Sequence, residues 1–284
     1  MNNKPELPSL SELLSLFEPE PSTEVRSARR AQMYQDSAVD QNAFSSWFPA
    51  VVAENIRHPS TLTIPLDLAF QDKVLEEQHP EGEYLEQVKK LADQIEAFGK
   101  QHGFPLFIKS SFTSAKHSWN TSCYLENANP TGLLDNLFEI LHFQACCSPH
   151  RYTPELVVRE MIPTDAKFWA FGNMPVTEEF RVFARSGRAV GYQPYWPKTS
   201  IQDASLDDYD DLLTSIATPS AKDLAYMTEA SERVTKRLGG YWSVDFLKDK
   251  DGRLWLIDMA EGDKSFKCEV GYKKIAPPQP DPEP

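Results

Sequence analysis

The stretch that decides the fold is YWSVDFLKDKDGRLWLIDMAE, residues 241–261. It contains two runs of aromatic and β-branched residues joined through Asp251-Gly252, a strong signal for a tight turn in a β-hairpin. If these two residues form the loop of a type I′ turn, counting outward along both strands places Asp245 directly opposite Asp258. The two carboxylates then share one face of the sheet.

Directly opposed residues have Cβ atoms about 5 Å apart, so two carboxylates at these positions repel each other. A cation between them relieves the repulsion, and Mg²⁺ prefers one or two carboxylates together with phosphate oxygens. The pair therefore indicates a site for a magnesium–nucleotide complex. The alternative is that one aspartate is solvated at a strand end. The residues that alternate with the pair are expected in the core: Val244, Phe246, Ile257 and Met259.

The composition is that of a globular protein. Of the 284 residues, 40% are hydrophobic and 25% are charged, and the chain is long enough for one large core or for two lobes that share a cleft. The net charge of −13 disfavours nonspecific binding to nucleic acid or to an anionic membrane. No run approaches the roughly 18 apolar residues of a membrane span, and a signal-peptide pattern is missing. We therefore expect a cytoplasmic protein with neither nucleic acid nor membrane as a partner.

The chain divides into three parts. Residues 1–43 are expected to form a peripheral helical extension, with helices at residues 10–17 and 22–35. The main body is expected from residue 44 to residue 274. The Pro-rich acidic residues 275–284 are expected to be a disordered tail.

Within the body, helices and strands are mixed. Apolar residues at 3–4 spacing predict long helices, and short apolar or alternating runs predict strands. Acidic residues 203–211 are expected on a solvated helix face, and Cys146 and Cys147, which end an apolar helix pattern, are expected to be reduced core thiols. The order of the elements gives an α+β body of antiparallel hairpins with packed helices. The predicted helices are 83–103, 131–147 and 219–238, and the predicted strands are 61–65, 105–109, 155–160, 178–184 and 189–195.

Charged side chains interrupt several apolar strands. Lys109 ends a buried strand and Lys116 follows in a hydroxyl-rich loop, where ammonium groups suit phosphate oxygens, although Lys116 alone would fit a solvated lysine equally well. Arg159-Glu160 is a charged pair inside an apolar strand, so it must be satisfied by mutual pairing or by a ligand.

Glu179 and Arg181 lie two residues apart and so share one face of a strand. The planar fork of Arg181 suits a phosphate or a carboxylate. A salt bridge between these two residues is the open alternative. The sequence has no Walker-type glycine-rich loop and no G-x-G-x-x-G. If a nucleotide binds, side chains hold its phosphates.

The order of these motifs resembles the ATP-grasp superfamily and, within it, the cell division cycle 123 family and its ATP-grasp relatives. The resemblance spans roughly residues 44–268 and is weak between the motifs. The segments that carry it are FSSWFP (44–49), FIK with SAK (107–109 and 114–116), LVVRE (156–160), EFR with GYQ (179–181 and 191–193) and WLID (255–258).

The resemblance implies two α+β subdomains with mainly antiparallel sheets that grip ATP between them, approximately residues 44–155 and 156–274. It also implies Mg²⁺ and ATP as cofactors. Glu160, Met161 and Ile162 would meet the adenine and ribose. The cofactor-binding residues that we expect are Lys109, Lys116, Arg159, Glu160, Met161, Ile162, Glu179 and Arg181; Arg181 and Lys116 are also the expected catalytic residues, and Asp245, Asp258 and Glu261 the expected metal ligands.

Two functions from different classes follow from the resemblance. The first is an ATP-dependent carboxylate–amine ligase that works through an acyl phosphate, the usual activity of the superfamily. The second is a non-catalytic ATP-binding assembly factor, as the cell division cycle 123 proteins imply by their role with the translation initiation factor 2 complex. Where that family has Asn after the second metal aspartate, this chain has Ala260. That departure favours the assembly factor, unless Glu261 or Asp263 substitutes. A protein that binds no nucleotide is the third alternative.

Overall fold

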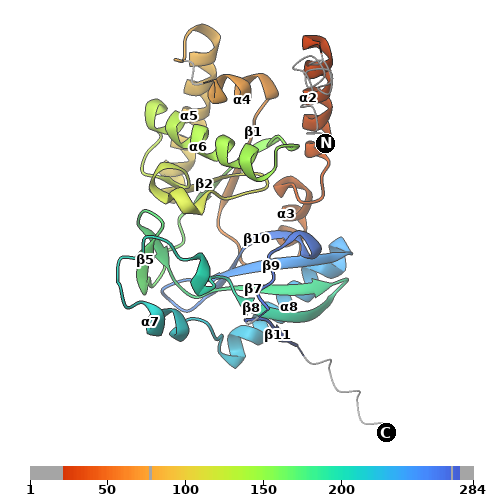
Figure 1. Ribbon diagram of the computed structural model, residues 1–284, viewed down its shortest axis with the longest axis vertical. Coiled ribbons are helices and arrows are strands. Elements are labelled where there is room, and N and C mark those ends of the chain that lie inside the picture. The colour runs from red at the N-terminus through yellow and green to blue at the C-terminus, as the bar shows by residue number, and fades with distance from the viewer. Residues whose placement is uncertain (1–21, 77–78, 270, 276–284) are drawn as a thin grey trace, which may run out of the picture.

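The computed structural model of the protein describes residues 22–76, 79–269 and 271–275. The predicted helix at residues 10–17 lies outside the described residues, and so do residues 276–284 of the predicted tail. Helices and antiparallel sheets form a mixed α+β fold (Figure 1), which confirms the expected fold class. In the described part of the chain, every helix is too short or too polar to cross a membrane.

The first sheet has four antiparallel strands in the order β1-β4-β2-β3. One face is covered by helices whose apolar residues recur every three or four positions, so that one stripe of each helix meets the sheet. The other face points toward the second sheet. The elements are β1 (Thr61–Pro65), β2 (Leu106–Ser110), β3 (Tyr124–Leu125), β4 (Glu155–Glu160), α4 (Leu68–Leu75), α5 (Gly82–His102) and α6 (Pro130–Cys147).

The second sheet has five antiparallel strands in the order β10-β9-β7-β8-β11. Helices α8 and α3 pack against its inner face, where Val244, Phe246 and Met259 are buried as expected. Helix α8 begins after Ser220, whose side chain accepts a hydrogen bond from a free backbone N–H of the first turn. The elements are α3 (Phe44–Ala53), β7 (Glu179–Arg185), β8 (Arg188–Pro194), α8 (Ala221–Leu238), β9 (Tyr241–Lys248), β10 (Leu254–Glu261) and β11 (Lys273–Lys274).

A third apolar cluster joins short elements beside the two sheets. A small hairpin of β5 (Phe168–Ala170) and β6 (Met174–Val176) packs with the 3-10 turn η1 (Lys116–Thr121) and the helix α7 (Asp210–Ser215). Because the strands have only three residues, no periodic pattern announced them. The acidic run 203–211 is largely exposed but forms mostly turns. The prediction of a helix there was wrong except at its end, since α7 begins at Asp210.

The N-terminal helix α2 (Thr23–Ala38) confirms the helix predicted at residues 22–35 and is tied to the body. The Arg30 guanidinium donates to the Tyr152 hydroxyl at 3.0 Å and pairs with the carboxylate of Asp72. Just after the helix, Asp40 pairs with Arg151 at 2.6 Å. The extension therefore packs on the four-stranded sheet and its helices.

The hairpin that decides the fold differs from the expected tight turn. Lys248 pairs with Leu254, which leaves residues 249–253 as a longer loop. A register shift between Leu256 and Asp258 then restores the count, so that Asp245 does lie opposite Asp258. The turn type was wrong, and the opposition of the two aspartates is confirmed.

The register shift also moves Ile257 out of the core. Leu256 is fully buried in its place, whereas Ile257 is half-buried and lines a cavity. A bulge of this kind turns successive side chains to faces that strict alternation does not predict. The expectation of a core role for Ile257 was therefore wrong.

The cysteines at the end of α6 are exposed and free, so the prediction of core thiols was also wrong. The buried face of this helix ends at Gln144. Cys146 and Cys147 lie in the last turn, beyond the part of the helix that packs on the sheet.

Candidate functional site

A cavity of about 730 Å³ lies between the two sheets. Its walls come from β2, the loop into η1, the segment that follows β4, the β5–β6 hairpin and the cleft-facing side of the five-stranded sheet. Cavities of this size commonly hold small-molecule ligands. Nine of the residues expected in the site line it: Lys109, Lys116, Arg159, Glu160, Met161, Ile162, Glu179, Asp245 and Asp258.

Four functional side chains form a continuous row across the five-stranded sheet. Asp258 on β10 is opposite Asp245 on β9, and Asp245 is opposite Arg181 on β7. Arg181 is in turn opposite Gln193 on β8. Directly opposed residues point to the same side of a sheet. The row therefore runs from the pair of aspartates to Gln193 along one face.

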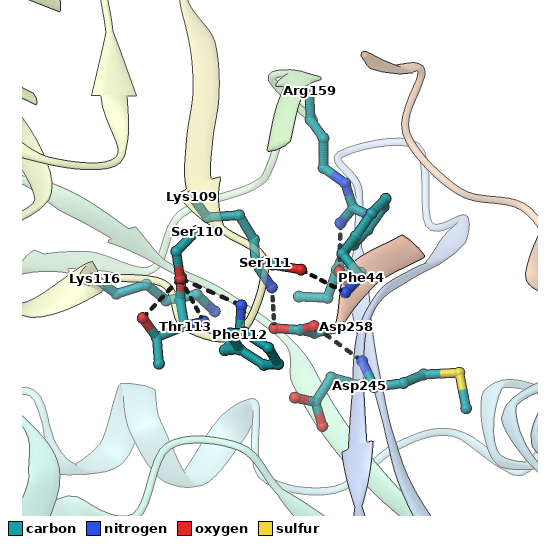
Figure 2. A network of polar contacts seen from close by, with 12 residues as sticks. Phe44, Lys109, Ser110, Ser111, Phe112, Thr113, Lys116, Arg159, Asp245 and Asp258 are labelled. Atoms are coloured by element: carbon teal, nitrogen blue, oxygen red, sulfur yellow. Dashed lines mark hydrogen bonds and ion pairs between the residues drawn. The ribbon is translucent and has the colours of Figure 1, made fainter. Parts of the chain in front are cut away.

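Lys109 and Asp258 form an ion pair between the two sheets, with Nζ 2.7 Å from Oδ2 (Figure 2). Lys109 is only 1% exposed. Burial lowers the pKa of the Lys109 ammonium, and the carboxylate of Asp258 partly offsets that effect. The other oxygen of Asp258 accepts the backbone N–H of Met259 at 3.0 Å.

Lys116 pairs with Glu179 at 2.7 Å, again inside the cavity. The Trp196 indole donates to the second oxygen of the same carboxylate at 3.0 Å. The Lys116 ammonium lies 4.5 Å from the centre of the Tyr195 ring, a favourable cation–π contact. Burial lowers the pKa of Lys116, but the charge of Glu179 outweighs burial and leaves the pKa raised. Lys116 therefore stays protonated at neutral pH.

Arg181 grips Asp245 with two hydrogen bonds of 2.8 Å, from Nε to Oδ1 and from Nη2 to Oδ2. This two-pronged geometry is the strong form of a carboxylate–guanidinium pair. Burial lowers the pKa of Arg181, but the charge of Asp245 more than compensates and raises it. The alternative of a same-strand salt bridge to Glu179 is not what the structure contains, because the residue directly opposite on β9 is the better placed carboxylate.

Arg159 and Glu160 do not pair with each other, because consecutive residues of a strand point to opposite faces. Glu160 accepts the backbone N–H of Ser60 at 2.8 Å. Arg159 is 2% exposed, donates through Nη1 to the carbonyl of Ile257, and lies 4.8 Å from the centre of the Phe44 ring (Figure 2). Burial lowers its pKa to about 10. Among the described residues, its Nε and Nη2 have no hydrogen-bond partner.

Glu261 is not brought to the other two expected metal ligands. It does not line the cavity in the described structure, and its carboxylate bonds to Asn42 and Lys264. In the described residues no cluster of three or more His, Cys, Asp or Glu side chains could hold a metal. The opposed carboxylates of Asp245 and Asp258 nevertheless fit Mg²⁺, which usually takes one or two carboxylates and completes its shell with phosphate oxygens and water.

The apolar part of the lining was not foreseen from the sequence. It comes from residues such as Phe107, Trp119, Met174, Leu247 and Ile257. Side chains of these types are indistinguishable from core residues in a sequence pattern. They give the cavity flat apolar walls, as ligand pockets usually have.

Two subdomains with antiparallel sheets, which meet at a cleft lined by paired cations and carboxylates, define an ATP-grasp fold. A family model for an ATP-grasp domain, the third family of its clade, matches residues 47–266, which is more than half of the chain. The chain belongs to this ATP-grasp family. Its expected resemblance to the ATP-grasp superfamily is therefore confirmed. No curated protein matches the sequence.

Several solved structures are similar to the chain. Cdc123 from Schizosaccharomyces pombe shares 20% identity, with a TM-score of 0.49, over 77% of this chain and 82% of that one. A RimK domain ATP-grasp protein from Sphaerobacter thermophilus shares 14% identity, with a TM-score of 0.41, over 77% and 58%. D-alanine–D-alanine ligase from Bacillus anthracis, complexed with ATP, shares 13% identity, with a TM-score of 0.39, over 77% and 52%.

Proposed function

We propose that this protein binds Mg²⁺–ATP in the cavity between its two sheets and uses it as an ATP-dependent carboxylate–amine ligase. One observation carries the proposal. Three cations that suit phosphate oxygens line or adjoin a single cavity, and each is held by its own carboxylate at 2.7 or 2.8 Å. A core would be more stable with apolar side chains in these places, so the pairs favour a functional role.

The pairs also suggest how the ligand is recognised. The phosphates of free ATP would meet the carboxylates of Asp245, Asp258 and Glu179 beside the cations that they need. Mg²⁺ supplies the compensating charge: Asp245 and Asp258 would hold it, and Lys109 and Arg181 would then be released to phosphate oxygens. Ligand binding is thus an exchange of partners in which few buried charges are left unpaired. The N–H groups of Arg159 that lack a partner in the described structure are further donors at the same cavity.

The polar and apolar walls divide the ligand between them. Phe107, Met174 and Leu247 offer flat apolar contacts for a base. Glu160, Met161 and Ile162 follow β4 at the edge of the cavity and would meet the adenine and ribose. Lys116, held by Glu179 at 2.7 Å, would keep a positive charge at the phosphates, where it would help to stabilise the transferred group.

In the ligase reaction, a carboxylate oxygen of the first substrate attacks the γ-phosphorus of ATP. The bond from that phosphorus to the β–γ bridging oxygen breaks, and ADP leaves with the electron pair. The amine of the second substrate then attacks the carbonyl carbon, phosphate leaves, and the amine proton passes to water. Such phosphoryl transfer needs positioning and positive charge more than covalent help. Arg181 would supply that charge beside the transferred group.

The second candidate is a non-catalytic ATP-binding assembly factor, and one observation favours it. Ala260 cannot serve as a metal ligand, and Glu261 bonds to Asn42 and Lys264. A site with two carboxylates would hold one Mg²⁺ well and a second one poorly. In this case ATP would order a surface for a partner chain. The expected cytoplasmic location remains part of either proposal.

Two measurements test the proposal. Calorimetry should find binding of ATP that depends on Mg²⁺, and Asp207→Asn, an exposed loop substitution, should leave it unchanged. Phosphate release should then exceed the no-enzyme rate when amino acids or peptides are added. Absence of Mg²⁺–ATP binding would refute both candidates. Binding without phosphate release for any acceptor would favour the assembly factor.

A further inference from the structure

After β10 the chain crosses the five-stranded sheet. It leaves the β10 edge at Glu261 and reaches the opposite edge, where β11 pairs with β8. Part of this crossing segment, residues 265–268, lies on the same face as the row that runs from Asp258 to Gln193. It contacts the row at the end remote from the two aspartates.

The contact is made by the main chain of the crossing segment. The carbonyl oxygen of Phe266 accepts a hydrogen bond from Arg181 Nη1 at 3.2 Å and one from Gln193 Nε2 at 3.3 Å. The backbone N–H of Cys268 donates to Gln193 Oε1 at 2.8 Å. Gln193 is 1% exposed. A buried side-chain amide is thus committed entirely to reading a carbonyl and an N–H of a peptide chain.

Apolar packing does not account for this placement. The side chain of Phe266 is 59% exposed, an unusual state for a large apolar residue whose main chain is held by a buried amide. Ser265 adds a contact between its hydroxyl and that of Ser243 at 2.7 Å. Release of residues 265–268 would therefore cost a few hydrogen bonds and little apolar burial. Segments with this balance open most readily.

The groups that hold the Phe266 carbonyl suit a carboxylate better than a neutral carbonyl. Arg181 carries a positive charge, and its Nη1 is the corner of the fork that Asp245 leaves available. The ammonium of Lys267 lies 3.8 Å from the centre of the Tyr272 ring, on the same crossing segment. A hydrogen bond in which both partners are charged is about twice as strong as a neutral one.

We infer that Arg181 and Gln193 form a binding subsite for the C-terminal residue of a peptide, and that the main chain of residues 266–268 occupies this subsite until the peptide displaces it. The peptide carboxylate takes the two hydrogen bonds that the Phe266 carbonyl now receives. The N–H of its last residue donates to Gln193 Oε1. The inference rests on the proposed function, since it places the acyl substrate beside Arg181 and names its class.

The test uses N-acetyl-trialanine with a free C-terminal carboxylate and the same peptide with a C-terminal amide. Each is titrated into the full chain with saturating Mg²⁺ and a non-hydrolysable ATP analogue, and ¹H–¹⁵N NMR follows the Cys268 amide and the Gln193 side chain. The free acid should shift both signals and bind at least about tenfold more tightly than the amide. Equal affinity for the two peptides, or binding that leaves the Cys268 signal in place, would overturn the inference.

Two variants sharpen the test. Gln193→Glu keeps the shape but removes the donor, and it should weaken binding of the acid about tenfold, whereas Gln101→Glu on the exposed end of α5 should not. Phe266→Gly gives the released segment more conformational freedom, and it should tighten binding by about two- to fivefold. If both variants bind the acid as the wild type does, the subsite is not at Gln193. If Gln193→Glu fails to fold, Phe266→Gly decides alone.

Failure of the proposed function is recognised separately. If the ATP analogue itself causes no shifts, then the proposed nucleotide site is wrong. The same peptide titrations without nucleotide then still decide whether Arg181 and Gln193 bind a C-terminal carboxylate.

Discussion

Lys109 and Asp258 are 149 residues apart in sequence and belong to different sheets, yet Lys109 Nζ lies 2.7 Å from Asp258 Oδ2. The ammonium is buried, while the Asp258 side chain is 28% exposed toward the cavity. The carboxylate thus occupies the place beside Lys109 that a phosphate oxygen would need. A ligand that enters the cavity must take over one or both partners of this pair.

The first prediction concerns Asp258→Asn. Removal of the carboxylate leaves Lys109 with an uncompensated charge, so metal-free ATP should bind more tightly than to the wild type, by at least about fivefold. Mg²⁺–ATP should bind at least about tenfold more weakly, since even the outer partners of metal ligands are worth that much. Calorimetry with and without EDTA measures both, with Asp207→Asn as the control. If both affinities change in the same direction, partner exchange is not how the site recognises its ligand.

The second prediction concerns Lys109→Met, which keeps most of the side-chain volume and removes the charge. It should weaken Mg²⁺–ATP by about tenfold or more, because a charge-assisted hydrogen bond to phosphate is lost. The melting temperature without ligand should change little, since water can reach the Asp258 carboxylate once the ammonium is gone. Lys100→Met, whose side chain is 73% exposed, is the matched control. Unchanged ATP affinity would exclude Lys109 from the phosphate site.

The third prediction concerns the loop of the hairpin. The Asp249 carboxylate accepts the N–H groups of Asp251 at 2.9 Å and Arg253 at 2.8 Å and the indole N–H of Trp255 at 2.8 Å. Asp249→Asn loses acceptor capacity and should destabilise the fold by about 1–3 kcal/mol. Asp251→Asn in the same loop, with a side chain that is 53% exposed, should cost much less.

The effect of Asp249 should depend on pH in a defined direction. Burial would raise the pKa of Asp249, but the hydrogen bonds from Arg253 and Trp255 outweigh burial and hold the pKa below its ordinary value of 3.8. A carboxyl group with a depressed pKa stabilises the fold above its unfolded pKa and loses that contribution as the pH falls through its folded pKa. Urea unfolding should therefore show a constant difference between wild type and Asp249→Asn near neutrality. A difference that does not shrink below pH 3.8 would contradict this role.

The hairpin shows how far the sequence could predict the site. The opposition of Asp245 and Asp258 was predicted from a two-residue turn that does not exist. The longer loop shifts the pairing by one residue, and the bulge at Ile257 shifts it back. The bulge lies where contacts remote in sequence reach β10: the Leu256 N–H donates to the carbonyl of Arg57 at 2.8 Å, and Arg159 donates to the carbonyl of Ile257. No local pattern contains that information.

The partners of the charged residues were beyond the sequence for a similar reason. A strand pattern places Glu179 and Arg181 on one face, which is correct. Their ion-pair partners come from the strand order β10-β9-β7, which brings Asp245 beside Arg181, and from the loop that delivers Lys116 to Glu179. Periodicity shows which side chains share a face but does not show which strands are neighbours.

The last prediction separates the two proposed functions through Arg181. In a ligase this guanidinium stabilises charge that develops as the γ-phosphoryl group moves, so Arg181→Ala should lower substrate-stimulated phosphate release by on the order of 100-fold. Binding of Mg²⁺–ATP should fall by less than about tenfold, because Lys109, Lys116 and the metal ligands remain.

Arg181→Lys should not restore turnover, because an ammonium cannot make the two-pronged contact that the structure shows at 2.8 Å to both oxygens of Asp245. The measurement is phosphate release with a panel of amino acids and peptides, with wild type and both variants side by side. In an assembly factor no release appears with any acceptor, and the same substitutions weaken only the binding of ATP or of a partner. Release that Arg181→Ala leaves intact would remove this residue from the mechanism while keeping the ligase.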